Sequence, residues 1–218
     1  GAINSVQLDS ELSRSNKEIY SCYPEKKKPF LVSFARPGGV PWTITAQEKK
    51  DALVKYHLIK RPRFQGYPFG DVKSKEAVLE LVDKTIAEGE MGHLYFHGIG
   101  GDWLSTPMDV YIALLDKLQA SNENVWVTDH ISWHKYLTER SNAQVKGEEI
   151  DDDAIMITLA SSADPELYDL PLTLETRVPM QWSECYIEQG DINTYRPAIE
   201  GKVRYDALPN GVDIVISA

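Results

Sequence analysis

The chain of 218 residues carries a formal net charge of −10, because 33 aspartates and glutamates outnumber 23 lysines and arginines. An acidic surface is repelled by nucleic acid and by anionic membranes, so neither is an expected partner, whereas neutral sugars are compatible with it. The hydrophobic content of 42% is typical of a globular protein, and no apolar run is long enough to span a bilayer.

The first 142 residues predict strands that alternate with helices. Thr45 and Glu48 fit a capping box, and Thr106 is expected to cap the helix that Pro107 begins. Strands and helices in this alternation indicate a parallel sheet. Helical spacing of apolar residues predicts helices at 6–20, 45–56, 75–88, 107–118 and 129–140, and short apolar runs predict strands at 29–35, 57–59, 92–98 and 125–127.

The pattern changes after residue 142. Residues 141–153 are polar and acidic, which predicts a solvated linker; a calcium loop is the alternative, but its ligand spacing and central glycine are missing. Asn210-Gly211 predicts a tight hairpin turn. We therefore predict two domains, 1–145 and 146–218, the second a small antiparallel β-sandwich. Its expected strands are 154–160, 172–178, 184–188, 202–205 and 212–217.

His97 is the first candidate for chemistry. A strand over 92–98 would place His93, Tyr95 and His97 on one face and end in glycines. His97 would then lie at the carboxyl end of the strand, where catalytic groups gather in α/β folds. A general acid or base is one interpretation, and a histidine hydrogen-bonded within the core is the other.

The histidines predict no metal site. His93 and His97 on one strand would be about 13 Å apart, too far for one zinc ion. His130 and His134 have a workable spacing on a helix, but they lack a third ligand, so an exposed helix face is the favoured interpretation.

The two cysteines predict neither a thiolate metal site nor a redox motif, because Cys22 and Cys185 have no Cys-x-x-Cys companion. A disulfide between them and two inert thiols both remain open. A serine-hydrolase mechanism is disfavoured, since no Gly-x-Ser-x-Gly elbow is present.

Several segments in residues 8–142 together resemble the polysaccharide deacetylase family. The resemblance implies a partial (β/α) barrel that removes N- or O-acetyl groups from a polysaccharide or oligosaccharide, using water activated by a divalent metal such as zinc. It also implies an extracytoplasmic protein with an appended β domain. The segments are Glu11-Leu12-x-x-Ser15-x-x-x-Ile19, Phe34-Ala35-Arg36-Pro37-Gly38-Gly39, Leu94-Tyr95-Phe96-His97-Gly98-Ile99-Gly100, Val125-Trp126-Val127 and Tyr136-Leu137-x-x-Arg140.

The resemblance also assigns site residues. His97 matches the family's catalytic histidine, the acid that protonates the leaving group, a task that suits an imidazole with an ordinary pKa of about 6.5. Arg36 corresponds to the arginine of the family's Arg-Pro turn, which orients the catalytic base, although it is displaced by one position when the following Pro-x-Gly is aligned; here it is a candidate for substrate binding. Asp102 and Trp103 are expected to line a sugar site, the indole by stacking; core packing and surface shielding are the alternatives.

The family's metal ligands, an Asp-Asp pair and a His-x-x-x-His, precede the helix predicted at 6–20, and this chain carries neither. We therefore expect no metal site here and no activity from the chain alone. A shortened chain and a lineage that lost its site are both open, and a non-catalytic glycan-binding or scaffolding protein is the alternative function.

A barrel without its first strands would leave the strand at 29–35 as an apolar edge. Because unpaired edges bind other strands, we expect residues 30–34 to be covered by another subunit, a rearranged segment or the missing half.

Overall fold

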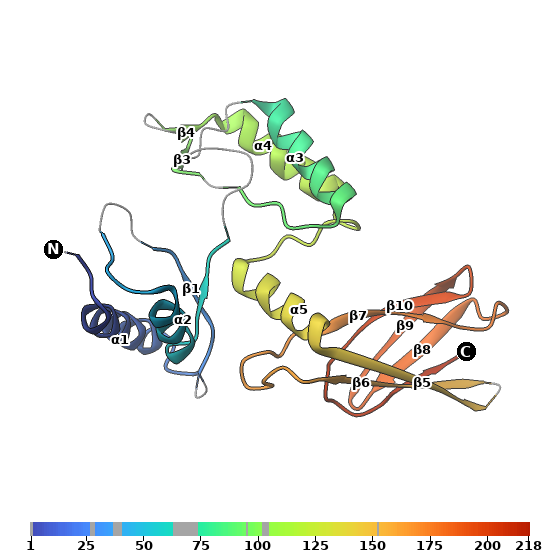
Figure 1. The fold of residues 1–218 in the computed structure, drawn as a ribbon. Helices are drawn as coiled ribbons and strands as arrows, with labels where there is room; N and C mark the ends of the chain where they lie inside the picture. The colour runs from blue at the N-terminus through green and yellow to red at the C-terminus, as the bar shows by residue number, and fades with distance from the viewer. Residues whose placement is uncertain are drawn as a thin grey trace. The chain divides into compact units, whose positions relative to one another are not determined.

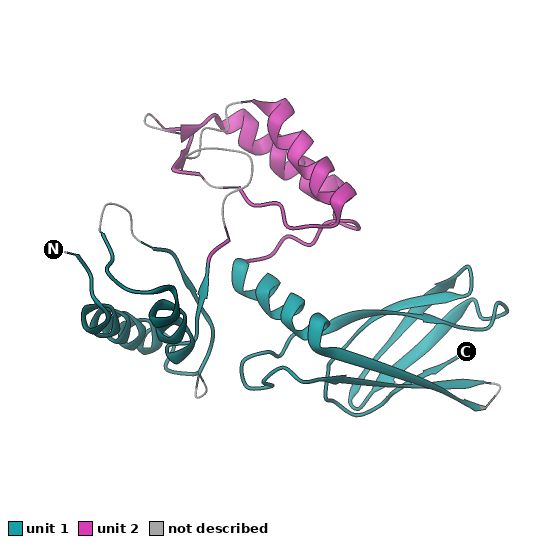
Figure 2. Cartoon of the chain, viewed as in Figure 1, with its two compact units in different colours: residues 1–60, 130–218 teal, residues 61–129 magenta. Residues whose placement is uncertain are grey.

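The structure is a computed structural model that describes residues 2–26, 29–36, 41–62, 74–94, 96–101, 105–151 and 153–218. Its residues fall into two compact units, 1–60 together with 130–218, and 61–129 (Figure 2). The boundary predicted at 145/146 falls inside strand β5 (Ala143–Asp151), and the division into those two domains stays a prediction. In the described ranges, no helix combines the length and the apolar character that a membrane crossing requires.

Residues 1–60 form a β-α-β unit preceded by a helix. Strand β1 (Val32–Phe34) pairs in parallel with β2 (Leu58–Lys60), and helix α2 (Ala46–Lys55) makes the crossover between them. Helix α1 (Ser5–Ser21) comes first in the chain (Figure 1). These two helices and two strands confirm the predictions for the first 60 residues.

The capping box predicted at the start of α2 is formed. The Thr45 hydroxyl accepts a hydrogen bond from Glu48 N (3.1 Å), and the Glu48 carboxylate accepts one from Thr45 N (2.7 Å). The bond from Thr45 N, followed by that from the Thr45 hydroxyl, lowers the pKa of the Glu48 carboxyl. These bonds fix where the crossover helix begins.

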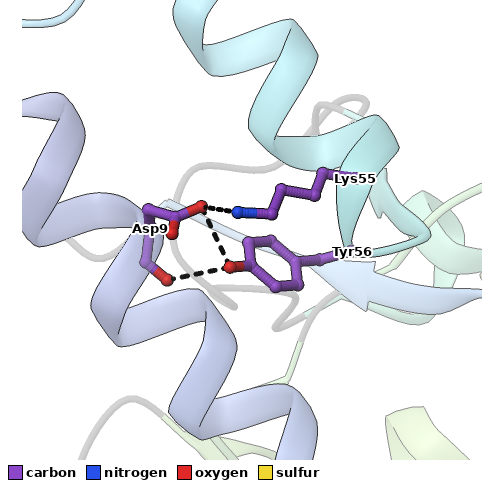
Figure 3. A network of polar contacts seen from close by, with 3 residues as sticks. All are labelled: Asp9, Lys55 and Tyr56. Carbon is purple, nitrogen blue, oxygen red and sulfur yellow. Dashed lines mark hydrogen bonds and ion pairs between the residues drawn. The ribbon is translucent and has the colours of Figure 1, made fainter.

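A polar network ties α1 to α2 (Figure 3). Lys55 Nζ lies 2.6 Å from Asp9 Oδ1, and the Tyr56 hydroxyl donates to the same oxygen at 2.9 Å. These two bonds, that of Lys55 first, lower the pKa of the Asp9 carboxyl. Leu8 and Leu12 of α1 are buried in a core that they share with β2, so the helix is held over the strand pair by both polar and apolar contacts.

The unit 61–129 is built on two packed helices, α3 (Lys75–Glu88) and α4 (Met108–Ala120). The left-handed Gly89 (φ 63°) ends α3, whose bounds match the helix predicted at 75–88. Its short parallel strands are β3 (Gly98–Ile99) and β4 (Ser105–Thr106). The core between the helices consists of Val78, Val82, Val110 and Leu114.

Three predictions for this unit are wrong. The described residues of 92–97 form no strand. Residues 125–127 form no strand either, and Trp126 is 54% exposed. Thr106 does not cap α4: it lies in β4, and Pro107 occupies the N-cap without a side-chain hydrogen bond. Apolar runs this short do not distinguish a strand from an extended loop.

Residues 143–217 form one antiparallel sheet of seven strands, in the order β5-β6-β11-β8-β9-β10-β7. The sheet curls into a half-barrel (Figure 1), so the two-sheet sandwich that we predicted is not formed. Its concave core includes four side chains without exposed surface, Cys185, Val203, Ile214 and Ile216. The strands after β5 are β6 (Ala154–Ser161), β7 (Leu172–Arg177), β8 (Glu184–Gln189), β9 (Ile192–Ile199), β10 (Lys202–Ala207) and β11 (Ile214–Ser217).

The polar stretch predicted as a linker is part of this sheet. Helix α5 (His130–Asn142) runs directly into β5, which pairs with β6 along nearly its whole length. Because β5 is the outermost strand, its acidic side chains keep the edge soluble rather than mark a linker. The hairpin predicted at Asn210-Gly211 is also absent, since β10 and β11 are not neighbours in the sheet.

Candidate functional site

His97 lies in an irregular stretch ahead of β3, and its side chain is exposed. It therefore precedes a strand instead of ending one, and it is not a core histidine. The residues after it turn tightly: Gly100 has a φ of 65°, and its N–H donates to Thr106 O at 2.9 Å. This left-handed backbone explains the glycine, and it leaves the imidazole on the surface.

Arg36 is exposed just beyond the carboxyl end of β1. Its guanidinium lies over the Trp42 ring, 4.9 Å from the ring centroid, a cation–π arrangement that orients the side chain. Phe34 packs near the same indole, with 6.3 Å between ring centroids. Arg36 is thus held at the strand end where α/β folds place ligands.

The remaining predicted site residues cannot be joined to these two. Asp102 and Trp103 lie outside the described residues. Arg36 belongs to the unit 1–60 with 130–218, and His97 belongs to the unit 61–129, so each is described within its own unit.

The residues that the structure describes do not fit the divalent metal that the resemblance implies, since no three His, Cys, Asp or Glu side chains among them could hold an ion together. His130 Nδ1 lies 2.9 Å from Ser33 Oγ, and His134 Nε2 lies 3.4 Å from the Tyr168 hydroxyl. Both histidines are half-buried, so the exposed helix face that we predicted for them is wrong.

Helix α5 carries a cluster of titratable side chains that the sequence does not predict as a site. Glu139 is only 2% exposed, and its carboxylate accepts a hydrogen bond from Leu170 N at 3.1 Å. Lys135 Nζ lies 2.5 Å from Oδ1 of Asp169, the neighbour of Leu170 in the loop ahead of β7. Burial raises the pKa of the Glu139 carboxyl, and it lowers that of the His134 imidazole. The sequence offers one indication that Glu139 is buried. It follows Tyr136 by three residues and so lies on the same face of α5, and Tyr136 packs on the sheet core.

Replacing Glu139 by glutamine is expected to raise the free energy of unfolding near pH 7. A raised pKa in the folded state means that the buried carboxylate opposes folding once the pH exceeds that pKa, whereas the amide stays neutral and still accepts the bond from Leu170 N. The advantage of Glu139→Gln should therefore be largest above the raised pKa, shrink as the pH falls through that pKa, and reach its minimum below the ordinary glutamate value. Urea unfolding at several pH values measures it; an advantage that does not change with pH would contradict the burial argument.

The cysteines are both free: Cys22 is exposed and Cys185 is buried in the sheet core. Burial, followed by the nearby Glu184 carboxylate, raises the pKa of the Cys185 thiol. An uncharged thiol in that position packs as a small apolar side chain.

A pocket of about 590 Å³ lies between α1 and β1. Buried leucines, Leu8 and Leu12, line it from the helix, the residues of β1 line it from the strand, and Trp42 closes part of its wall. Its volume falls within the range of ordinary ligand pockets.

Neither protein-family models nor curated proteins nor solved structures gave a match to the chain.

Proposed function

We propose that the chain is the C-terminal part of a polysaccharide deacetylase and that His97 protonates the leaving group when an N- or O-acetyl bond of a glycan is hydrolysed. The observation that carries this proposal is the exposed imidazole of His97 beside a glycine turn, at the motif position of the family's acid. An acid must reach the leaving atom directly, which a histidine enclosed in a core does not.

The partial (β/α) barrel belongs to the same proposal. The parallel unit formed by β1, α2 and β2 is the repeating element of such barrels. Arg36 follows β1 at the carboxyl end, where barrel enzymes bind substrate, and its stacking on Trp42 supports a role in holding the sugar.

The metal-binding residues of this deacetylase are proposed to come from outside this chain, because its sequence carries neither of the family's metal motifs and its described residues hold no suitable group. The chain by itself is then inactive. An acetylated polysaccharide as substrate is consistent with an exported protein.

A non-catalytic glycan-binding protein is the second candidate, and one observation favours it. Tyr186 and Tyr195 lie directly opposite each other on β8 and β9, with 5.0 Å between ring centroids, and Tyr195 is 64% exposed. Exposed aromatic faces of this kind stack on sugar rings, although a cross-strand aromatic pair also stabilises a sheet.

The coding sequence ahead of Gly1 separates the two candidates. An Asp-Asp pair and a His-x-x-x-His encoded there support the deacetylase, because they supply the ligands that a metal-dependent hydrolase needs. A coding sequence that continues without them favours glycan binding.

A further inference from the structure

The connection between β10 and β11, residues 208–213, carries the dipeptide Asn210-Gly211 without forming the hairpin that it predicts. The side chain of Asn210 bonds to β6 instead. Its Oδ1 accepts a hydrogen bond from Ser161 N at 2.9 Å, and its Nδ2 donates one to Ser161 O at 3.0 Å. This pair of bonds, the Asn210 clamp, makes the carboxamide a partner for the last residue of β6.

The backbone of the dipeptide is fixed as well. Asn210 N donates to Leu159 O at 2.9 Å, and the φ of Asn210, 59°, lies in the left-handed region that asparagine tolerates better than most residues. A side chain at Gly211 would have no room, because its Cβ would lie 2.9 Å from Gln189 Nε2 and 3.3 Å from Leu208 O. The contacts of the connection therefore account for both residues of the dipeptide.

Gln189, the last residue of β8, ties the same connection to the sheet. Its Oε1 accepts from Leu208 N at 2.8 Å, and its Nε2 donates to Leu208 O at 2.8 Å and to Val212 O at 3.2 Å. None of these bonds involves Asn210. Replacing Gln189 therefore loosens the connection while the dipeptide and Ser161 keep their own atoms.

An asparagine before a glycine is open to a reaction that the clamp opposes. Gly211 N attacks Asn210 Cγ, the Cγ–Nδ2 bond breaks, and the amide group leaves as ammonia with the proton of Gly211 N, which closes a succinimide ring. Water then opens the ring at either carbonyl and gives aspartate or isoaspartate. The attack requires the carboxamide to turn relative to Gly211 N, which is easiest beside a residue without a side chain. A carboxamide held by two bonds to Ser161 cannot turn without breaking them.

We propose that Asn210 is a deamidation site whose reaction is gated by local opening of residues 208–213. Asn210 is exposed, so water reaches it once the clamp opens. The product cannot form the clamp again: an aspartate presents a second carboxylate oxygen to Ser161 O in place of a donor, and an isoaspartate adds a backbone atom to a left-handed turn. The reaction therefore marks irreversibly each chain whose connection has opened. The inference does not depend on the deacetylase proposal.

Mass spectrometry of the peptide that contains residue 210 follows the reaction in the whole chain, kept in mildly alkaline buffer. The folded chain is expected to react about tenfold or more slowly than the chain unfolded in urea, since the clamp must first break. Gln189→Ala is expected to accelerate the reaction of the folded chain several-fold, because it removes the bonds to Leu208 and Val212. Equal rates in the folded and unfolded chains, or an unchanged rate in Gln189→Ala, would overturn the proposal.

Val203→Ala is the matched control for local opening. Val203 has no exposed surface and lies in β10 outside the connection, so its truncation destabilises the sheet as a whole. The deamidation rate of this folded variant should stay near that of the wild type, and circular dichroism checks that both variants are folded. An acceleration as large as that in Gln189→Ala would show that the reaction passes through unfolding of the sheet, which contradicts local gating.

Low concentrations of urea, below the unfolding transition, test the same point without a substitution. Local opening exposes little surface, so the deamidation rate of the wild type should hardly change with urea in this range. A rate that rises in proportion to the unfolded fraction would overturn the proposal.

Discussion

If the proposed deacetylase is correct, replacing His97 by alanine is expected to lower the kcat of the complete enzyme by about 10²- to 10⁴-fold, the usual contribution of a positioned general acid. KM should change little, because the imidazole acts on the departing atom and does not hold the sugar. Acetate release from acetylated oligosaccharides over a range of concentrations measures both constants.

The leaving group provides a sharper test of the same role. An aryl acetate releases a phenolate that needs no proton, so His97→Ala should cost far less on that substrate than on an acetylated sugar. His93→Gln is the matched control, since it changes a histidine four residues earlier to which the resemblance assigns no role. Equal losses on both substrates, or a loss as large in His93→Gln, would remove His97 from proton transfer.

Replacing Ile216 by alanine is expected to lower the free energy of unfolding of the β-sheet by about 2–5 kcal/mol. Ile216 has no exposed surface and lies in β11, between β6 and β8, where it is opposite Ile155 and Ile187. Removing its side chain leaves a cavity that surrounding strands, fixed by their ladders, cannot fill. Urea unfolding followed by far-ultraviolet circular dichroism measures the change.

Val215 provides the control on the same strand. It is 36% exposed and faces outward, so Val215→Ala should cost much less than Ile216→Ala. Similar losses for the two variants would contradict the inward and outward assignment of β11.

Local signals explain which elements the sequence predicts. Asn4 and Thr45 cap α1 and α2 through bonds to residues three positions away, and Gly89 ends α3 in a left-handed conformation. The chemistry at these positions is complete within one turn of helix, so the sequence can indicate it; it predicts the Thr45 cap and the end of α3, but not the Asn4 cap. Strands lack such signals: the sequence does not predict β9 (Ile192–Ile199), and the acidic composition of the edge strand β5 favours a linker there.

The candidate site depends on contacts between distant residues, which explains why the sequence predicts less of it. The burial of Glu139 is set by a loop 31 residues away, and the contact of His130 with Ser33 spans 97 residues. The unpaired edge of β1, by contrast, is predictable from the sequence, because the apolar run at 29–35 indicates a strand whose edge another segment covers. The structure adds to it the pocket and two buried polar atoms, Asn16 Oδ1 and Trp42 Nε1.

Acetate release from acetylated oligosaccharides tests the central claim most directly, namely that the chain supplies His97 but not the metal-binding residues of a deacetylase. In buffer that contains zinc, the 218-residue chain is expected to release no acetate above the uncatalysed rate. A longer gene product that carries an Asp-Asp pair and a His-x-x-x-His ahead of α1 is expected to release it. Acetate release by the 218-residue chain alone would contradict the account, and so would a complete gene product that carries both motifs and is inactive.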